Sequence, residues 1–228
     1  MQFQTRLFIT DSMSVFLSER ESFTTSFLKK SEWTRNAILD SALEFLWLQP
    51  FREMTVAKLM TIAGASRPAF YQYFTDLHDL METLLRKIEV DIYETTDPWF
   101  DGKGDPVAML RESQAGLVRI GYDKGPILRA VSDASSSDKR LELAWEKFLA
   151  AFDDAVTARI ELQQEQGLIP AFDARSIAIA LNRLDTSLLI HAFGRLPRND
   201  PKPVHEALTR IWTSTLYGCG SESKRKTI

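Results

Sequence analysis

The chain has 228 residues, of which 44% are hydrophobic, and its formal net charge is −3. This length and apolar content suffice for one large core or two modest ones, and the mild negative charge excludes a protein that binds polyanions indiscriminately. A single cysteine, Cys219, excludes an internal disulfide, and three widely spaced histidines give no metal-type spacing, so neither a metal site nor a cofactor is expected.

The first 30 residues mix Ser, Thr and Phe without a helical period. We expect residues 1–30 to form a flexible extension, within which Met13 is an alternative to Met1 as the translation start. This segment lacks the basic start and continuous apolar stretch of a signal peptide, and no apolar run in the chain approaches the ~20 residues of a membrane span. The expected location is therefore the cytoplasm, without a membrane partner.

Helical periodicity begins at Trp33 and predicts a first helix of about four turns that stops before Gln49-Pro50. Thr55 stands where the N-cap of a second, short helix belongs, and Gly64 ends that helix.

Ser66 is placed to cap a third helix whose first turn holds Pro68, where the missing N–H costs nothing. A fourth helix is predicted from Leu77 to Tyr93, with a leucine-rich face.

The segment "TTDPWFDGKGDP" (residues 95–106) is rich in Pro, Gly and Asp, which indicates a boundary loop. Further helices are predicted near residues 106–121, 126–134, 138–166, 173–193 and 203–217. No stretch alternates as a strand does, so the predicted fold is all-α. We expect a helix-turn-helix domain over 31–76, a helical ligand-binding and dimerisation domain over 77–218, and a flexible tail over 219–228.

Two short helices joined by a glycine-containing turn form a helix-turn-helix, whose second helix lies in the major groove of DNA. On the third helix, Arg67, Pro68, Tyr71 and Gln72 share one side, while Phe70, Tyr73 and Phe74 share the other. Arg pairs with guanine, Gln pairs with adenine, and a Tyr hydroxyl reaches phosphate, so the first side suits DNA. The spacing alone also fits an ordinary amphipathic helix pair with half-buried tyrosines.

Positive charge near this motif fits the DNA-binding interpretation, and it fits a random scatter of a few charges equally well. Six Lys or Arg residues and four acids lie between residues 29 and 75. They include the Lys29-Lys30 pair, Arg35 and Lys58. The free N–H groups at the start of the second helix offer a phosphate seat.

The segment "ILDSALEFL…FREMTVAKLMTIAGASRPAFYQYFTDLHDLMETLL" resembles the N-terminal domain of TetR-family transcriptional regulators over residues 37–85. The resemblance implies that DNA is contacted by six residues, one of which, Tyr73, also lies on the core side of its helix. The six are Thr55, Arg67, Pro68, Tyr71, Gln72 and Tyr73. The family usually has a Lys where this chain has Leu77. The resemblance therefore implies that one phosphate contact is lost, or is replaced by His78.

The last two predicted helices carry more apolar surface than one small domain needs. The final helix has a regular stripe, and the helix before it is apolar around much of its circumference. One interpretation is a homodimer built as a four-helix bundle from the last two helices of each subunit. The other is a helix that is central to its own domain.

The second domain offers the materials of a ligand pocket: a broad apolar wall with a few polar groups. The wall is formed by Trp145, Phe148, Leu149, Phe152, Val156 and Trp212, and the polar groups are Asn182 and Asp185. The aromatic residues also fit a plain core. Asp185 could instead pair with Arg183 or Arg210 at a dimer surface, because an unpartnered buried carboxylate is costly.

The segments "LAWEKFLAAF", "ALNRLDTSLLI" and "RIWTSTLYG" are similar to a mycobacterial branch of the same family over most of residues 105–218. The resemblance implies a pocket lined by Met109, Leu110, Leu117, Gly121, Trp145, Leu149, Phe152, Val156, Asn182, Asp185, Ile190 and Trp212. That branch has aromatics at the positions of Leu110, Leu117 and Gly121, and Asn at that of Asp185. The pocket here is therefore expected to be less aromatic and more acidic.

These observations predict a homodimeric repressor that binds double-stranded operator DNA and is released by a small, largely apolar effector. An activator or an architectural DNA-binding protein without ligand control remains the alternative. An enzyme using Asp185 or a Tyr, or a protein-interaction module, fits less well, because no nucleophile–base or metal constellation is present in the sequence.

Overall fold

The computed structural model describes residues 31–101 and 104–218, which form helices and no strands. The expectations for residues 1–30 and 219–228, including Met13, the Lys29-Lys30 pair and Cys219, lie outside these ranges. The helices are residues 31–48, the 3₁₀ helix η1 (Phe51–Glu53), α2 (Val56–Ile62), α3 (Arg67–Tyr71), α4 (Leu77–Asp101), α5 (Pro106–Ser135), α6 (Lys139–Glu165), α7 (Ala174–Phe193) and α8 (Pro201–Tyr217). The all-α prediction is confirmed.

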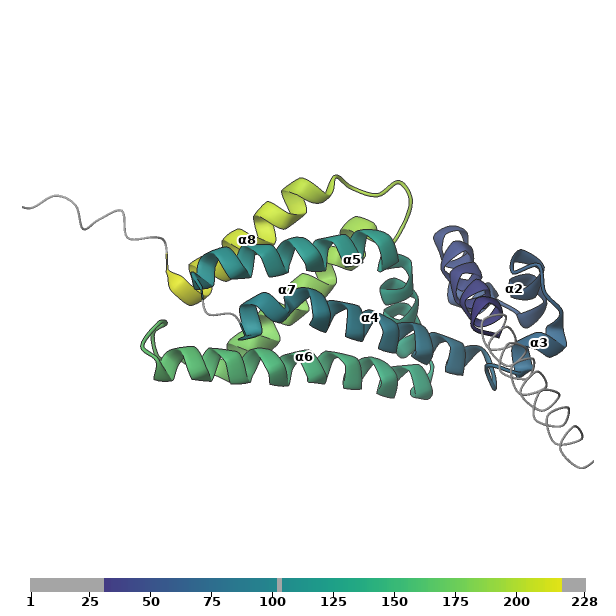
Figure 1. Cartoon of the computed structure of the whole chain (residues 1–228), viewed down its shortest axis with the longest axis horizontal. Helices are drawn as coiled ribbons and strands as arrows, with labels where there is room; N and C mark the ends of the chain where they lie inside the picture. Colours follow the sequence, from purple (N-terminus) through teal and green to yellow (C-terminus); the bar gives the residue numbers. More distant parts are fainter. Residues whose placement is uncertain (1–30, 102–103, 219–228) are drawn as a thin grey trace, which may run out of the picture.

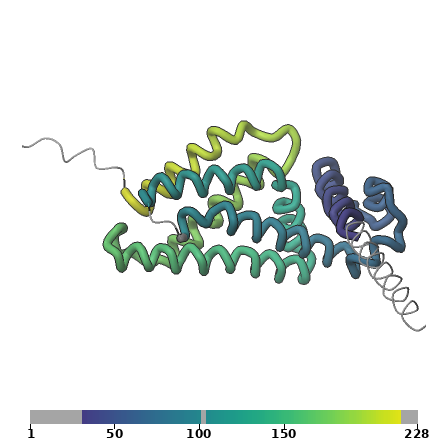
Figure 2. The backbone as a smooth tube through the Cα atoms, in the orientation of Figure 1, coloured from purple at the N-terminus to yellow at the C-terminus, as the bar shows by residue number. Residues whose placement is uncertain are grey.

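The helices form a small head at one end of an elongated helical body (Figure 1). The head consists of the helix over 31–48, η1, α2 and α3, and the body consists of α5 to α8 with most of α4. The first residues of α4 lie beside α3, and its remaining turns run into the body, as the backbone trace in Figure 2 shows. One long helix therefore belongs to both parts of the molecule.

Each of the helices α4 to α8 begins at an aspartate whose side chain accepts one or two backbone N–H groups of the first turn. These N-caps are Asp76, Asp105, Asp138, Asp173 and Asp200. A carboxylate at this position satisfies donors that have no partner within the helix and interacts favourably with the helix dipole. The caps fix where each long helix starts.

The predicted boundary loop over 95–106 is wrong, because α4 continues through Pro98 to Asp101. A proline inside a helix costs about 3 kcal/mol or more. Packing offsets this cost: the Trp99 side chain is buried, packs edge-on against Trp212 at 5.7 Å, and donates its Nε1 hydrogen to Tyr217 at 2.9 Å. The helix therefore includes residues 95–101, which were predicted to lie in the loop.

The predicted break between residues 121 and 126 is also wrong, since α5 is one continuous helix that includes Pro126. Gly121 and Gly125 are points of close approach instead. A Cβ on Gly125 would lie 2.6 Å from the Phe193 carbonyl oxygen, and one on Gly121 would lie 2.8 Å from Leu189 Cδ2. The two glycines let α7 pack directly on the α5 backbone.

A continuous apolar core joins the head to the end of the body nearest to it. It contains residues of the first helix such as Ile38 and Phe45, the α3 residue Phe70, and residues of α5 and α6 such as Ile127 and Phe148. Because one cluster spans both parts, the head is packed onto the body and is not held by α4 alone.

Candidate functional site

Helix α2 has the predicted N-cap at its start and the predicted glycine after its end. Thr55 caps α2, and its Oγ1 accepts the Lys58 backbone N–H at 3.2 Å. Gly64 has φ of 62°, in the left-handed region that favours glycine, and reverses the chain after α2. Both sequence predictions for this helix are confirmed.

One side chain anchors α3, and the opposite side faces outward. Phe70 is fully buried and packs against Phe74, with ring centroids 5.5 Å apart. Tyr71 is 55% exposed, and Arg67 and Gln72 are exposed beside it. The helix therefore presents an arginine, a tyrosine and a glutamine to solvent from a fixed base.

Ser66 occupies the N-cap position of α3, but its hydroxyl makes no capping hydrogen bond. An N-cap side chain normally accepts from the second or third residue of the helix. The second residue here is Pro68, which has no N–H, and the Ala69 N–H goes to the Ser66 carbonyl at 3.0 Å. The predicted side-chain cap is therefore wrong, and the exposed hydroxyl is left outside the helix.

Two of the predicted DNA-contacting residues are partly engaged inside the head. Tyr73 is half-buried against the core, on the side that its helical angle predicts. The Lys58 ammonium donates to the Glu53 carbonyl at 2.9 Å and to Gln49 Oε1 at 3.4 Å. Nearby, the Arg35 guanidinium lies over the Phe74 ring, 5.5 Å from its centroid.

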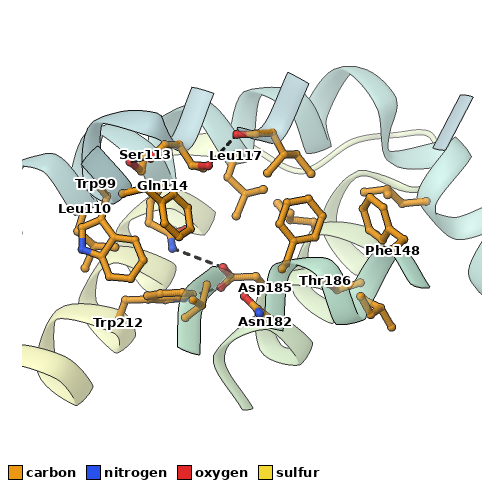
Figure 3. A pocket seen from close by; sticks show the side chains of 18 residues that line it. Trp99, Leu110, Ser113, Gln114, Leu117, Phe148, Asn182, Asp185, Thr186 and Trp212 are labelled. Atoms are coloured by element: carbon orange, nitrogen blue, oxygen red, sulfur yellow. Dashed lines mark hydrogen bonds between the residues drawn. The ribbon is translucent and has the colours of Figure 1, made fainter. Parts of the chain in front are cut away.

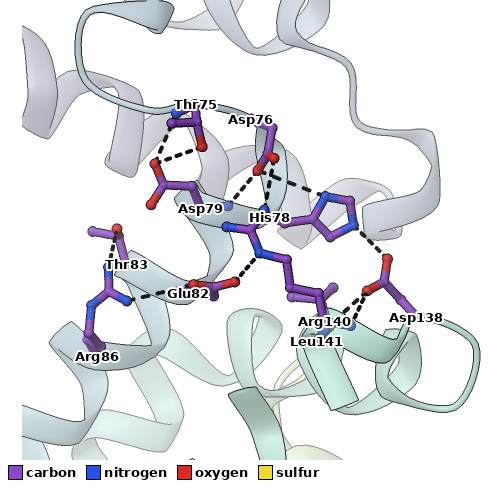
Figure 4. A network of polar contacts seen from close by, with 10 residues as sticks. All are labelled: Thr75, Asp76, His78, Asp79, Glu82, Thr83, Arg86, Asp138, Arg140 and Leu141. Atoms are coloured by element: carbon purple, nitrogen blue, oxygen red, sulfur yellow. Dashed lines mark hydrogen bonds and ion pairs between the residues drawn. The ribbon is translucent and has the colours of Figure 1, made fainter. Parts of the chain in front are cut away.

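A reciprocal pair of contacts ties the start of α4 to the start of α6 (Figure 4). His78 Nε2 lies 2.6 Å from Oδ2 of Asp138, the N-cap of α6, and Arg140 Nη1 donates at 2.8 Å to Oδ2 of Asp76, the N-cap of α4. Arg140 Nε also donates to Glu82 at 2.5 Å. We call these five residues the clasp. Since His78 is held by Asp138, its position gives no support to the replacement phosphate contact.

Two of the clasp carboxylates, Asp76 and Asp138, are held in their charged form by the helix ends they cap. The Asp79 backbone N–H lowers the pKa of Asp76, and the Leu141 N–H lowers that of Asp138, in each case against some desolvation. Arg140 adds to the effect on Asp76 and His78 adds to that on Asp138. Through Arg140, the clasp is therefore an ionic contact between the N-termini of α4 and α6 at neutral pH.

A cavity of about 80 Å³ lies within the body, enclosed by α4, α5, α6, α7 and α8. The residues that line it are mostly apolar: Ile92, Thr96, Trp99, Phe100, Leu110, Ser113, Gln114, Leu117, Leu128, Phe148, Leu149, Phe152, Val156, Asn182, Asp185, Thr186, Leu189 and Trp212.

Most of the predicted pocket residues line this cavity, but Met109, Gly121, Trp145 and Ile190 do not. Trp145 lies one turn nearer the start of α6, where it stacks on Phe148 at 5.4 Å. Gly121 is covered by Leu189, Ile190 packs against the core shared with the head, and Met109 packs in the core around Trp99.

The sequence analysis missed the contribution of α4 to the cavity. Trp99 and Phe100 lie in the segment that was predicted as a loop, so a helical face was not considered there. Gln114 was missed because an isolated glutamine on a helix carries no signal of burial in the sequence. The signal that could have revealed α4 was the pair of large aromatics beside Pro98.

Asp185 is the charged group of the cavity wall. Its Oδ1 accepts Trp212 Nε1–H at 2.9 Å, and its Oδ2 accepts Gln114 Nε2–H at 3.4 Å (Figure 3). Burial raises the pKa of Asp185 to about 7, although both hydrogen bonds act in the opposite direction.

The alternative partners considered for Asp185 lie elsewhere. Arg183 makes two hydrogen bonds to Asp153 on α6, at 3.1 and 2.8 Å, and Asn182 Nδ2 donates to the same carboxylate at 2.9 Å. Arg210 is exposed on α8. Within one chain, Asp185 therefore pairs with neither Arg183 nor Arg210.

Some other kinds of site are not found in the described ranges. Within residues 31–101 and 104–218, no group of three or more His, Cys, Asp or Glu could hold a metal ion. Over the same part of the chain, no helix is both long enough and apolar enough to cross a membrane.

A helix-turn-helix head packed on a helical body is the architecture of a DNA-binding protein. Comparison with known families specifies which one. The model "Bacterial regulatory proteins, tetR family" matches residues 38–84, and "Transcriptional regulator EthR, C-terminal domain" matches residues 111–218. The chain belongs to the TetR family of transcriptional regulators, with a C-terminal domain of the EthR type.

Relatives agree with this assignment. The chain is 27% identical over 189 residues to the HTH-type transcriptional regulator EthR of Mycolicibacterium smegmatis, covering 80% of this chain and 85% of that protein. Identity to EthR of Mycobacterium tuberculosis is 26% over 186 residues, covering 80% and 86%.

A solved structure shares the fold. NalD of Pseudomonas aeruginosa, the secondary repressor of the MexAB-OprM multidrug efflux pump, superposes with a TM-score of 0.66 at 22% identity. The match covers 82% of this chain and 98% of NalD.

Proposed function

We propose that this TetR-family protein is a homodimeric repressor that binds operator DNA through α3 and leaves it when a small, largely apolar molecule fills the cavity. The observation that carries the proposal is the division of α3 into a buried anchor, Phe70, and an exposed side bearing Arg67, Tyr71 and Gln72. Base readout requires donors and acceptors on a rigid, outward-facing element. Such a protein would act on the chromosome, in the cytoplasm.

The exposed faces of α7 and α8 support the homodimer. The residues left exposed on these helices include small ones, among them Ala180, Ser187, Ala207 and Ser214, and Leu184, Leu188 and Ile211 are only partly covered. A self-complementary four-helix bundle requires small and apolar residues on such a face. Dimerisation would place two copies of α3 about one DNA turn apart, roughly 34–36 Å.

The connection between cavity and head supports ligand control. Helices α4 and α6 both line the cavity, through Thr96 and Trp99 on α4 and through Phe148 and Phe152 on α6. The clasp joins the N-termini of the same two helices next to the head. A ligand that separates the cavity walls would shift both ends of the clasp, and it would release DNA only through its higher affinity for the shifted state.

Operator selection followed by a gel shift tests the proposal. Full-length protein is used to select binding sites from randomised duplexes, and the affinity for the selected site is compared between wild type and Arg67→Ala. We expect the variant to lose about 1–3 kcal/mol of specific binding, mostly at one base position. Lys147→Ala, which removes an exposed positive charge from α6, is the matched control and is expected to bind like wild type.

Two results would contradict the assignment. Selection that enriches no sequence means that the protein does not read DNA bases. An Arg67→Ala protein whose sequence preference is unchanged means that Arg67 makes no base contact. If reporter transcription falls on deletion of the gene, instead of rising, the protein is an activator and not a repressor.

A further inference from the structure

Several of the polar groups that line the cavity already donate a hydrogen within the protein. Trp212 Nε1 and Gln114 Nε2 both donate to Asp185. The Ser113 hydroxyl donates to the Thr96 carbonyl at 3.1 Å, and the Thr96 hydroxyl donates to the Ile92 carbonyl at 2.8 Å. The indole and hydroxyl hydrogens are therefore not available to a ligand, whereas lone pairs of Asp185 and Gln114 are.

Two acceptors are short of donors. Gln114 Oε1 is buried and has no hydrogen-bond partner, and the Gln114 side chain is only 3% exposed. Asp185 Oδ2 receives only the 3.4 Å contact from Gln114, which is long for an N–H···O bond to a carboxylate. A buried acceptor without a donor costs free energy that a ligand can recover.

The cavity wall can carry negative charge but no positive charge. Asp185 is the only residue of the cavity lining that can carry a charge, since the lining contains no Lys, Arg or His. The cations on neighbouring elements are directed elsewhere or exposed. Arg183 pairs with Asp153 on α6, and the Arg159 guanidinium lies over the Trp99 ring, 5.9 Å from its centroid. Arg210 on α8 and Arg111 on α5 are exposed. No cation of the described chain neutralises Asp185.

From these contacts we infer that the effector is an amine, carrying its N–H donors to Asp185 and Gln114 and its apolar body toward Phe148. The inference rests on the proposed ligand control and specifies the chemistry of that same cavity. In Figure 3, Trp99 and Trp212 lie at one end of the cavity and Phe148 at the other, with Asp185 between them, so an apolar body can extend from Asp185 toward Phe148.

An amine ligand also fits the raised pKa of Asp185. In the empty cavity, burial raises the pKa of Asp185 to about 7, so much of the carboxyl is neutral near physiological pH. A protonated amine would restore the ionised form, because an adjacent positive charge lowers the pKa of a carboxyl. Below a pH of about 7, binding therefore releases a proton from Asp185, and the affinity for the amine falls with falling pH.

The test compares three probes that share one carbon chain: n-octylamine, 1-octanol and octanoate, titrated calorimetrically into the full-length protein at pH 8. We expect octylamine to bind at least tenfold more tightly than either of the other two. Asp185→Asn is expected to lose at least tenfold in octylamine affinity and to keep its octanol affinity within about threefold. Asp133→Asn, the same change at an exposed position of α5, is the control and is expected to bind all three like wild type.

A wild-type protein that does not bind octylamine, or that binds octanol or octanoate as tightly, overturns the inference. So does an Asp185→Asn protein with unchanged octylamine affinity. A gel shift on the selected operator separates this failure from that of the proposed function. If octanol releases the operator, ligand control is supported and the preference for an amine is wrong. If octylamine binds without changing operator affinity, the amine site is supported and ligand control is wrong.

Discussion

Replacing Asp185 with Asn removes a titratable group from the cavity wall with almost no change in shape. The Asn Oδ1 can still accept Trp212 Nε1–H, which is 2.9 Å away in the wild type. Its Nδ2 can donate to the Gln114 amide oxygen after a rotation of that amide, and this oxygen has no partner at present. The variant therefore keeps the packing of the wall and removes only the cost of a buried charge.

The size of the effect follows from the pKa of Asp185. Folding raises this pKa from the ordinary 3.8 to about 7, so the stability that the protonated carboxyl contributes is present at low pH and is lost as the pH rises through about 7. At 1.36 kcal/mol for each pKa unit, the full loss is about 4 kcal/mol. Between pH 5 and pH 8 the loss is about 2–3 kcal/mol, because the unfolded chain is already ionised at pH 5.

Urea denaturation of the ligand-free protein at pH 5 and pH 8, at one fixed protein concentration, measures this effect. We expect Asp185→Asn to be more stable than wild type at pH 8 and to lose about 2–3 kcal/mol of that advantage at pH 5. Asp133→Asn, at an exposed position, is expected to show no pH-dependent difference. An Asp185→Asn protein that is less stable than wild type at pH 8, or whose advantage does not change with pH, would refute the reasoning.

Two further predictions concern the helix surfaces. Ala180→Glu places a charge on the exposed face of α7 and is expected to shift the dimer toward monomer in sedimentation experiments, whereas Ala158→Glu on the exposed face of α6 is expected to leave it dimeric. Equal behaviour of the two variants would remove α7 from the interface. Gly125→Ala is expected to lower the unfolding free energy by about 1–3 kcal/mol, because the new Cβ would lie 2.6 Å from the Phe193 carbonyl oxygen. An unchanged or higher Tm would contradict this close approach.

Local signals in the sequence determined the head of this protein. Thr55 at the N-cap of α2, Gly64 in the turn and the alternation of Phe70 with Arg67 and Tyr71 each act within a few residues. Capping, positive φ and helical phase depend on the backbone nearby, so they can be read without knowledge of the rest of the chain. The exposed and buried sides of α3 follow from them.

Tertiary packing decided the body. Pro98 and the Gly125-Pro126 pair predict breaks from their local chemistry, yet both lie inside long helices, because buried Trp99 and the close approach of α7 outweigh the cost of the missing N–H groups. The environment of Asp185 likewise could not be predicted from the sequence. Its two partners come from 71 and 27 residues away, and only the folded chain brings Gln114 and Trp212 to the same carboxylate.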